Sequence, residues 1–372
     1  MVEREPGPAP DTALIATVGA LVAIGLVMIF SASSAFAVEE HQDAAYFLKR
    51  QVVWLALGVA AAFGAYRIDH RVLRRAAPYT LVATIVALGL LFVPHVGTIV
   101  GGSSRWIGAG PVRFEPSEFA KLALVLYLAS ALARKGDRIR SLVHGVFPLA
   151  FVSGAIAMLV VKQPDLGTAT LLALTAGTML YVAGARLVHL GLVLAVVVPP
   201  AFLLVRHDPY KWGRVTAFLD PTKDPLGRGF HILQSLYALG NGGWFGVGLG
   251  FSHQKYFWLP EAHTDFIAAI IGEETGFLGI AIVVTLFLIF AYRAIRIALR
   301  ANDRFGFFLA IGCTATIVIQ AFVNLGVVSS SWPVTGVPLP FVSFGGASLV
   351  TSLVAAALVV NVGRTRAPAA SP

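Results

Sequence analysis

Charged side chains are scarce in this chain. Asp, Glu, Lys and Arg make up only 13% of its 372 residues, whereas hydrophobic residues make up 57%. A soluble globular protein carries about 25% charged residues, because its surface must face water. The composition therefore excludes a soluble protein of ordinary type and indicates an integral membrane protein.

Cysteine is almost absent as well. The single cysteine, Cys313, excludes an intramolecular disulfide and a metal site built from several cysteines. Cys313 lies inside a long apolar run, where an isolated cysteine is expected to pack as a small hydrophobic side chain.

Apolar runs of about 20 residues recur along the chain, and a helix of that length crosses the hydrocarbon core of a bilayer. We therefore predict an all-α integral membrane protein with about ten transmembrane helices in a single polytopic domain, residues 12–362. The first run is expected to be retained, because it is too long for a signal-peptide core. Short cytoplasmic tails, 1–11 and 363–372, are expected to be disordered. The predicted spans are 12–36, 50–66, 76–94, 116–133, 145–161, 166–184, 187–205, 263–292, 305–328 and 341–362.

The basic residues follow the spans in a regular way. Three segments contain four Lys or Arg residues each and separate spans of the same parity, namely 66–75, 134–142 and 292–304. By the positive-inside rule these segments and both termini are cytoplasmic. The outer loops are then 37–49, 95–115, 162–165, 206–262 and 329–340. Topology thus explains the excess of positive charge, and no nucleic-acid partner is needed to account for it.

The large outer loop, 206–262, is far longer than a plain connection, which rarely exceeds about 12–15 residues. Its residues 230–239 have helical apolar spacing, which favours an amphipathic helix at the outer interface. The glycine-rich stretch 240–250 allows close backbone approach to a ligand, and the aromatic residues 256–258 suit the headgroup level. A glycine-rich nucleotide loop is excluded, since no strand precedes it and no Gly-Lys-Ser/Thr follows.

Asp265 is the most informative acid in the sequence. It stands in Leu259-Pro-Glu-Ala-His-Thr-Asp265, where a long apolar helix is expected to begin. An aspartate near the centre of a membrane helix costs about 2.5–3.5 kcal/mol, so one that persists usually faces a cavity and has a function. A helix cap or first-turn acid is the structural alternative. The position favours a functional carboxylate.

Glu118 and Lys121 follow Pro116 at the start of the fourth span and are spaced i,i+3, close enough to pair. We predict that the pair faces the interior of the bundle, although Glu118 alone would also suit the positive end of the helix dipole. Arg105 beside Trp106, in the preceding outer loop, suits either an interfacial pair or an anionic phosphate group.

Further polar residues stand near the ends of spans. Gln163-Pro-Asp165 links the fifth and sixth spans, and Asp165 suits a helix cap. Glu273 and Glu274 lie about two turns inside the eighth span, where contacts with neighbouring helices or water are the simplest interpretation.

Three prolines, Pro333, Pro338 and Pro340, forbid a continuous helix after the ninth span. The chain is therefore expected to bend outside and then re-enter the membrane. Small residues around Ser343 allow close helix packing, and we expect the bent segment to shape a site.

Four motifs, taken in order, resemble the SEDS family of bacterial cell-wall polymerases, whose members include FtsW, RodA and SpoVE. The resemblance extends almost from end to end, and the stretches 255–263 and 324–328 are more similar to FtsW than to RodA. The motifs are Arg105-Trp106 with Pro116-Ser-Glu-Phe-Ala-Lys121, Gln163-Pro-Asp-Leu-Gly-Thr168, Leu259-Pro-Glu-Ala-His-Thr-Asp265 with Gly272-Glu-Glu274, and Pro338-Leu-Pro-Phe-Val-Ser-Phe-Gly-Gly346.

This resemblance implies a peptidoglycan glycosyltransferase that polymerises lipid II on the outer face of the cytoplasmic membrane, in cell division, and releases undecaprenyl pyrophosphate. The attacking sugar hydroxyl needs a base, and the leaving pyrophosphate needs positive charge. Asp265 is then implied as the general base, with Arg105 and Lys121 stabilising the pyrophosphate. The residues implied to bind substrate are Arg105, Trp106, Glu118, Lys121, Gln163, Asp165, His263 and Ser343.

The same resemblance implies the partners and the location. Lipid II and polyprenyl-linked glycan are the implied substrates. A class B penicillin-binding protein, other membrane proteins of the divisome and membrane lipid are the implied partners, at the septum in the bacterial inner membrane. No cofactor is required by the motifs, although the sequence leaves a requirement for a divalent cation, Mg²⁺ or Mn²⁺, open.

Two other functional classes remain: a flippase or transporter of polyprenyl-linked precursors, and a non-catalytic scaffold for division proteins. A translocation pathway distributes charge through the depth of the bilayer. Most of the charged residues singled out above lie at the outer ends of spans, and this favours the enzyme.

Overall fold

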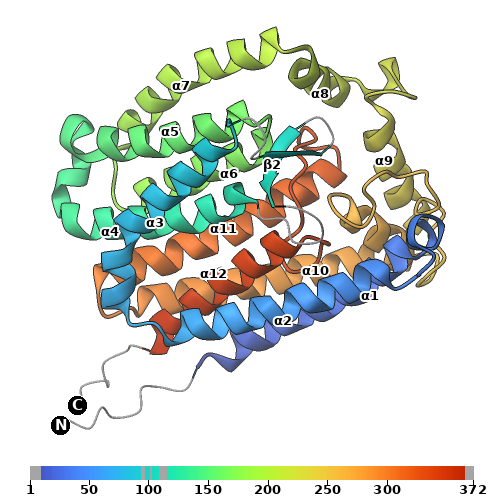
Figure 1. Cartoon of the computed structure of the whole chain (residues 1–372), viewed down its shortest axis with the longest axis horizontal. Coiled ribbons are helices and arrows are strands. Elements are labelled where there is room, and N and C mark those ends of the chain that lie inside the picture. Colours follow the sequence, from blue (N-terminus) through green and yellow to red (C-terminus); the bar gives the residue numbers. More distant parts are fainter. Residues whose placement is uncertain (1–9, 94–96, 101–102, 109–114, 365–372) are drawn as a thin grey trace.

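A computed structural model of the chain describes residues 10–93, 97–100, 103–108 and 115–364, in which long helices run back and forth between two ends of one bundle (Figure 1). Most of both predicted tails and part of the 95–115 loop lie outside these residues. The helices are α1 (Thr12–His41), α2 (Tyr46–Arg67), α3 (His70–Leu90), α4 (Pro116–Lys135), α5 (Phe147–Lys162), α6 (Leu166–Val182), α7 (Leu187–His207), α8 (Pro209–Leu219), α9 (Phe230–Gly242), α10 (Ile267–Leu299), α11 (Arg304–Val328) and α12 (Gly346–Arg364).

The predicted helical membrane fold is confirmed. Nine of the described helices are long and apolar enough to cross a membrane, and α6 is a shorter apolar helix of 17 residues. Together they match the ten predicted spans in order. Several predicted starts are wrong: α2 and α3 begin earlier, at Tyr46 instead of 50 and at His70 instead of 76. Two others begin later, α10 at Ile267 instead of 263 and α12 at Gly346 instead of 341. Before α10 and α12 the backbone bonds to distant segments and is not helical.

Several helices begin where an aspartate side chain satisfies backbone N–H groups that the first turn leaves unbonded. The carboxylates of Asp11, Asp69, Asp165 and Asp303 each accept a hydrogen bond of this kind, at the starts of α1, α3, α6 and α11. Helix α4 begins instead with Pro116, whose missing N–H costs nothing at that position.

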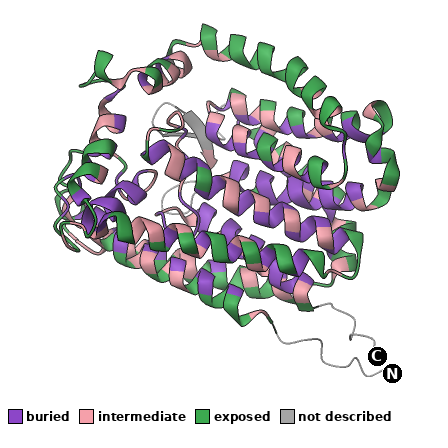
Figure 2. Ribbon diagram, turned by 180° about the vertical axis from the view of Figure 1, so that it is seen from behind, coloured by how far each residue is buried: buried purple, intermediate pink, exposed green. Residues whose placement is uncertain are grey.

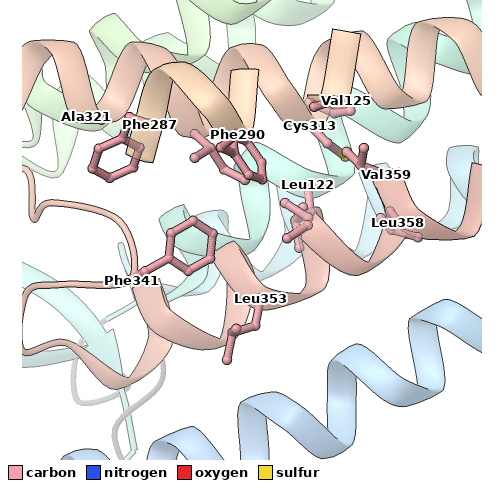
Figure 3. Close-up of a cluster of buried hydrophobic side chains, with 14 of the residues drawn as sticks. Leu122, Val125, Phe287, Phe290, Cys313, Ala321, Phe341, Leu353, Leu358 and Val359 are labelled. Atoms are coloured by element: carbon pink, nitrogen blue, oxygen red, sulfur yellow. The ribbon is translucent and has the colours of Figure 1, made fainter. Parts of the chain in front are cut away.

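The most buried spans are α4, α11 and α12, whereas α7 has no buried residue (Figure 2). The core of the bundle includes Phe290 of α10, Phe341 before α12 and the small side chain of Cys313 of α11 (Figure 3). Cys313 is a buried free thiol, as the sequence predicted. This packing fixes α4, α11 and α12 relative to one another, and these three helices carry several of the site residues.

The segments between spans contain short elements of their own. Strands β1 (Gly97–Val100) and β2 (Ser103–Ile107) form an antiparallel hairpin that the sequence analysis did not predict. The helix predicted at 230–239 is present as α9, and it packs on the bundle through the Ser235 hydroxyl, which donates to the Val328 carbonyl at 2.8 Å. Short 3₁₀ or π segments occur at Gly136–Arg140, Leu142–Val146 and Pro221–Lys223.

The three basic segments meet at one end of the bundle. Arg293 pairs with Asp11 at 2.7 Å, which brings the start of α1 to the end of α10. Asp303 lies 3.9 Å from His70 at the start of α3, and Arg134 of α4 lines one cavity together with arginines of α3. This arrangement agrees with the prediction that the three basic segments lie on the same side of the membrane. That this side is the cytoplasmic one stays a prediction.

Labelling in intact cells tests this orientation. We expect Lys135→Cys to be protected from a membrane-impermeant maleimide and Lys223→Cys to react, both in a Cys313→Ala background. The Lys223 side chain is 81% exposed, so its position presents no steric barrier to the reagent. Labelling after permeabilisation serves as the control for reactivity at 135. The reverse pattern in intact cells would overturn the topology.

Candidate functional site

Asp265 precedes α10 in non-helical backbone that distant side chains hold in place. The Asp265 carbonyl accepts a hydrogen bond from Asn324 Nδ2 at 2.8 Å, and the Thr264 carbonyl accepts one from the Ser343 hydroxyl at 2.7 Å. The residue at the N-terminal cap of α10 is Phe266, so Asp265 stands one residue before the cap position. The functional interpretation of Asp265 stays a prediction.

The proline segment, residues 333–345, forms a wall beside Asp265. The predicted bend is confirmed, since this stretch is not helical. Asn324 Nδ2 also donates to the Val337 carbonyl at 2.7 Å. A β-carbon on Gly336 would lie 3.4 Å from Asp265 Oδ2, so the carboxylate lies against this segment while the residue stays partly exposed.

Two non-glycine residues, one in the stretch before α10 and one in the proline segment, have left-handed backbone. The φ angles are 56° at Glu261 and 66° at Phe341, a region that L-residues seldom occupy. Such conformations cost about 1–3 kcal/mol and cluster at functional sites, where the surrounding structure imposes them. Both residues lie in non-helical segments, and one of these segments carries Asp265.

His263 packs among the aromatic rings of Phe36, Phe47 and Phe344, at centroid distances of 6.0, 4.5 and 5.6 Å. Burial in these surroundings lowers the pKa of His263 below its usual value, and the nearby Glu261 carboxylate offsets part of that shift. The imidazole is therefore neutral at pH 7. It forms part of the wall beside Asp265 and does not act there as a cation.

The lowered pKa of His263 predicts a loss of stability in mild acid. Below about pH 6.5 the unfolded chain binds more protons at this residue than the folded protein, so folding becomes less favourable as the pH falls. His263→Phe keeps the aromatic packing and removes the titration. We expect the thermal midpoint of the wild type to fall further than that of His263→Phe between about pH 7.5 and about pH 5.5.

His231, whose pKa burial also lowers, is unchanged in both proteins and cancels in this comparison. If the thermal midpoints of the two proteins fell by the same amount, His263 would not titrate in this pH range.

The predicted pair of Glu118 and Lys121 is present in the centre of the bundle. Lys121 Nζ lies 2.8 Å from Glu118 Oε2, and the two side chains are only 3% and 6% exposed, Lys121 first. The ammonium also donates to Gln320 Oε1 at 2.8 Å, and the Thr351 hydroxyl donates to Glu118 Oε2 at 2.9 Å. The buried charges are thus paired and bonded, and they join α4 to α11 and α12.

Gln320 and Asn324 connect this pair to the site. Gln320 Nε2 donates to the Pro338 carbonyl at 2.9 Å, and Asn324, one turn further along α11, holds the carbonyl of Asp265. A path of hydrogen bonds therefore leads from Lys121 to the proline segment and to the backbone of the candidate base. The burial of Lys121 favours a positioning role over the direct contact with pyrophosphate that the sequence suggested.

Gln163 and Asp165 lie between α5 and α6, just before the point where α6 approaches the proline segment. Asp165 Oδ1 accepts a hydrogen bond from an N–H of the first turn at 3.0 Å, so the cap interpretation is confirmed, and Gln163 Nε2 donates to a carbonyl in the last turn of α3 at 3.0 Å. A β-carbon on Gly167 would lie 2.5 Å from the Thr335 carbonyl oxygen, so only glycine permits this approach. Substrate binding by Gln163 and Asp165 stays a prediction.

Arg105 and Trp106 lie in β2, just before α4. Trp106 is partly exposed and stands opposite Thr98 of β1. The side chain of Arg105 lies outside the described part of the structure, so its contact with a phosphate group also stays a prediction. Ser343, by contrast, is buried, and its hydroxyl joins two backbone segments. It accepts a hydrogen bond from the Leu339 N–H at 2.8 Å and donates one to the Thr264 carbonyl.

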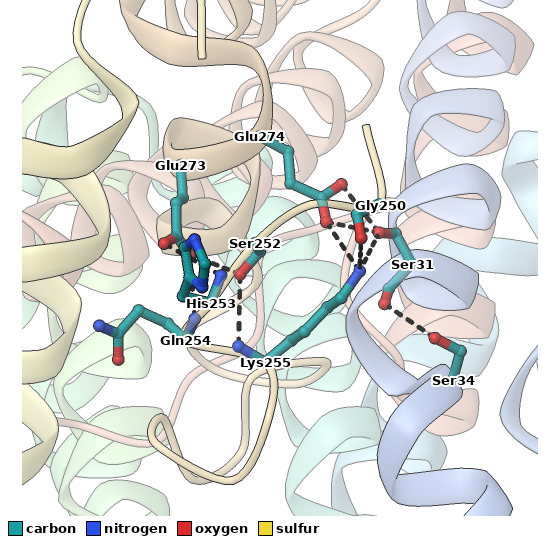
Figure 4. A network of polar contacts seen from close by, with 9 residues as sticks. All are labelled: Ser31, Ser34, Gly250, Ser252, His253, Gln254, Lys255, Glu273 and Glu274. Carbon is teal, nitrogen blue, oxygen red and sulfur yellow. Dashed lines mark hydrogen bonds and ion pairs between the residues drawn. The ribbon is translucent and has the colours of Figure 1, made fainter. Parts of the chain in front are cut away.

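Sequence reasoning missed a second buried network, around the break in α10 (Figure 4). Gly276 has φ 68° and ψ −166°, a conformation that glycine adopts readily. Just before it, Glu274 pairs with Lys255 at 3.3 Å and accepts from the Ser31 hydroxyl at 2.6 Å. The side chains of Lys255 and Glu274 are 3% and 0% exposed. The signal in the sequence was two adjacent acids within an apolar run, each of which needed a distant partner.

Glu273 completes this network. Its carboxylate accepts hydrogen bonds from the Ser252 hydroxyl and from the N–H groups of His253 and Gln254 (Figure 4). The structural interpretation of Glu273 and Glu274 is confirmed. The two acids anchor residues 252–255 of the outer loop to α10, in the second turn after the stretch that carries Asp265.

Within the described part of the chain, no group of three or more His, Cys, Asp or Glu side chains comes together as a metal site would require. The need for a divalent cation is therefore left open.

The model of the cell cycle protein family that comprises FtsW, RodA and SpoVE matches residues 11–367. The chain belongs to this family. Its match covers every span and each of the four motifs on which the resemblance rested, so the SEDS assignment is confirmed.

Individual relatives in the FtsW/RodA/SpoVE family match over most of their length. A protein of Trichlorobacter lovleyi named "Probable peptidoglycan glycosyltransferase FtsW" is 44% identical over 352 residues, which cover 95% of this chain and 92% of the relative. Stage V sporulation protein E of Bacillus subtilis is 42% identical over 355 residues, with coverages of 95% and 97%.

Solved structures show the same fold. A chain of a peptidoglycan synthase complex, described for its structural coordination of polymerization and crosslinking, has a TM-score of 0.78 at 32% identity and covers 96% of this chain and 98% of its own. The rod shape determining protein RodA of Thermus thermophilus has a TM-score of 0.72 at 29% identity, with coverages of 97% and 99%. These matches confirm the multi-pass helical membrane fold, and the names of the relatives agree with the predicted class of enzyme.

Proposed function

We propose that this protein is a peptidoglycan glycosyltransferase that polymerises lipid II into glycan strands on the outer face of the bacterial inner membrane. The observation that carries the proposal is the position of Asp265, a partly exposed carboxylate whose backbone is fixed by α11 and the proline segment. Family membership and the names of the relatives support the class of reaction.

In the proposed reaction the acceptor sugar hydroxyl attacks the anomeric carbon of the donor. The new carbon–oxygen bond forms as the bond from that carbon to the pyrophosphate oxygen breaks, and undecaprenyl pyrophosphate leaves. Asp265 accepts the proton of the hydroxyl, a task for which a carboxylate within hydrogen-bond reach is suited. The neutral ring of His263, two residues before Asp265, is proposed to contact the substrate without adding charge.

The leaving pyrophosphate needs positive charge. Arg105, in the hairpin before α4, is the proposed contact. Lys121 is assigned to positioning instead, since it lies within the buried pair and holds the proline segment through Gln320. Glycan transfer at this site is proposed to serve cell division, at the septum, beside a class B penicillin-binding protein that crosslinks the product. A solved structure of a peptidoglycan synthase complex with the same fold supports such a partner.

Purified full-length protein, incubated with radiolabelled lipid II in detergent, tests the proposal directly. We expect glycan polymer on a gel, with more product when the class B partner is added. Translocation of lipid II across vesicles without polymer would identify a flippase instead. Neither polymer nor translocation, with or without the partner, would leave the scaffold as the function and refute the enzyme.

A further inference from the structure

A cavity of about 580 Å³ opens at the end of the bundle opposite to Asp265. Its lining residues come from the first turns of α3 and the last turns of α4, and they are Arg71, Arg74, Arg75, Pro78, Tyr79 and Arg134. We refer to it as the arginine cavity. Four arginines that line one hollow give it a positive potential, which attracts an anion.

No acid among the described residues pairs with these four arginines. The nearest acid in sequence, Asp69, caps α3 by accepting from the backbone N–H of Arg71 at 2.7 Å. Asp303 caps α11 and lies 3.9 Å from His70. Three of the arginines also stand in the first two turns of α3, where the helix dipole already disfavours positive charge. No described acid therefore pairs with the positive charge of these exposed arginines, and this charge would stabilise an anion in the cavity.

The positive-inside rule explains why arginines occur at this end of the bundle, but it does not make them converge on a single hollow from two helices. The surface next to the cavity suggests the source of the anion. Tyr79, on the cavity wall, is 76% exposed, and Val72, Val82 and Val86 of α3 are each more than half exposed. This apolar strip starts at the arginines and continues along the span, so a molecule with a charged head and apolar chains would match both parts.

We propose that the arginine cavity binds the phosphate headgroup of an anionic phospholipid of the cytoplasmic leaflet, with the acyl chains along the exposed face of α3. Guanidinium groups bind phosphate oxygens in a bidentate manner, and basic residues near the membrane surface attract anionic lipid. The site lies apart from Asp265 and does not depend on the proposed transfer reaction.

Lipid binding by the intact protein tests this assignment. Full-length protein is placed in nanodiscs that contain phosphatidylglycerol and phosphatidylcholine, and the lipids that it retains on transfer to detergent are counted by native mass spectrometry. The double variant Arg74→Gln/Arg134→Gln removes one cavity arginine from α3 and one from α4. It keeps most of the Lys and Arg residues that set the orientation of the protein in the membrane. The matched control, Arg138→Gln/Arg300→Gln, removes the same charge from exposed positions at the same end but outside the cavity.

We expect the wild type and the control to retain phosphatidylglycerol in preference to phosphatidylcholine, and the cavity variant to bind it about tenfold more weakly. Equal weakening in both variants would mean that diffuse charge attracts the lipid, and unchanged binding in the cavity variant would mean that the cavity is not the site. Displacement of the lipid by inorganic phosphate at millimolar concentration would identify a site for soluble phosphate. Each of these three results would overturn the proposal.

Discussion

Replacing Asp265 with asparagine is expected to slow polymerisation of lipid II by about 10²–10⁴-fold, the loss typical when a general base is removed. Asparagine has the same size but does not accept a proton at neutral pH. The fold should survive, because the asparagine keeps the backbone carbonyl that accepts the hydrogen bond from Asn324. Initial rates of glycan formation by the purified proteins measure the effect.

The matched control is Glu39→Gln, which removes one exposed acid near the end of α1. It should polymerise at the wild-type rate. Thermal unfolding of all three proteins separates loss of chemistry from loss of fold. An Asp265→Asn protein that is folded and polymerises within about tenfold of wild type would remove this carboxylate from the mechanism and leave electrostatic stabilisation of the pyrophosphate as the remaining account.

Replacing Lys121 with methionine is expected to destabilise the protein by about 3–5 kcal/mol, because it leaves a buried carboxylate without its cation. Methionine keeps most of the volume of the lysine stem. Glu118 would retain only the Thr351 hydroxyl as a side-chain partner, and Gln320 would lose the ammonium that helps to orient it. We expect a lower thermal midpoint, a lower yield and slower polymerisation, since the proline segment beside Asp265 depends on Gln320.

The double variant Glu118→Gln/Lys121→Met distinguishes a charge effect from a packing effect. It removes both charges, so it should recover much of the stability that the single variant loses. Lys49→Met provides the surface control, because Lys49 pairs with Asp43 at 2.7 Å but is 69% exposed, and its loss should change little. If Lys121→Met were as mild as Lys49→Met, the pair would not have the central structural role that we assign to it.

Features that depend only on residues close together in the sequence were predictable from the sequence alone. The ten spans follow from apolar runs long enough to cross a bilayer, and one common side for the basic segments follows from their placement between those runs. The pair of Glu118 and Lys121 was predictable because residues three apart lie on one face of a helix whatever surrounds it. The bend after α11 followed from three prolines, each of which lacks a backbone donor.

Only the tertiary structure decided how these pieces form a site. Hydrophobic length does not show that residues 263–266 and 341–345 are non-helical, because contacts of Asn324 and Ser343 with distant carbonyls replace the helical bonds there. Nor does any local pattern pair Glu274 with Lys255, or Lys121 with Gln320 across 199 positions. A charged residue within an apolar run indicates that it has a partner in the folded protein. Which residue is that partner depends on how the helices pack. The sequence therefore determined the helices and the candidate base, and the fold determined what holds that base in place.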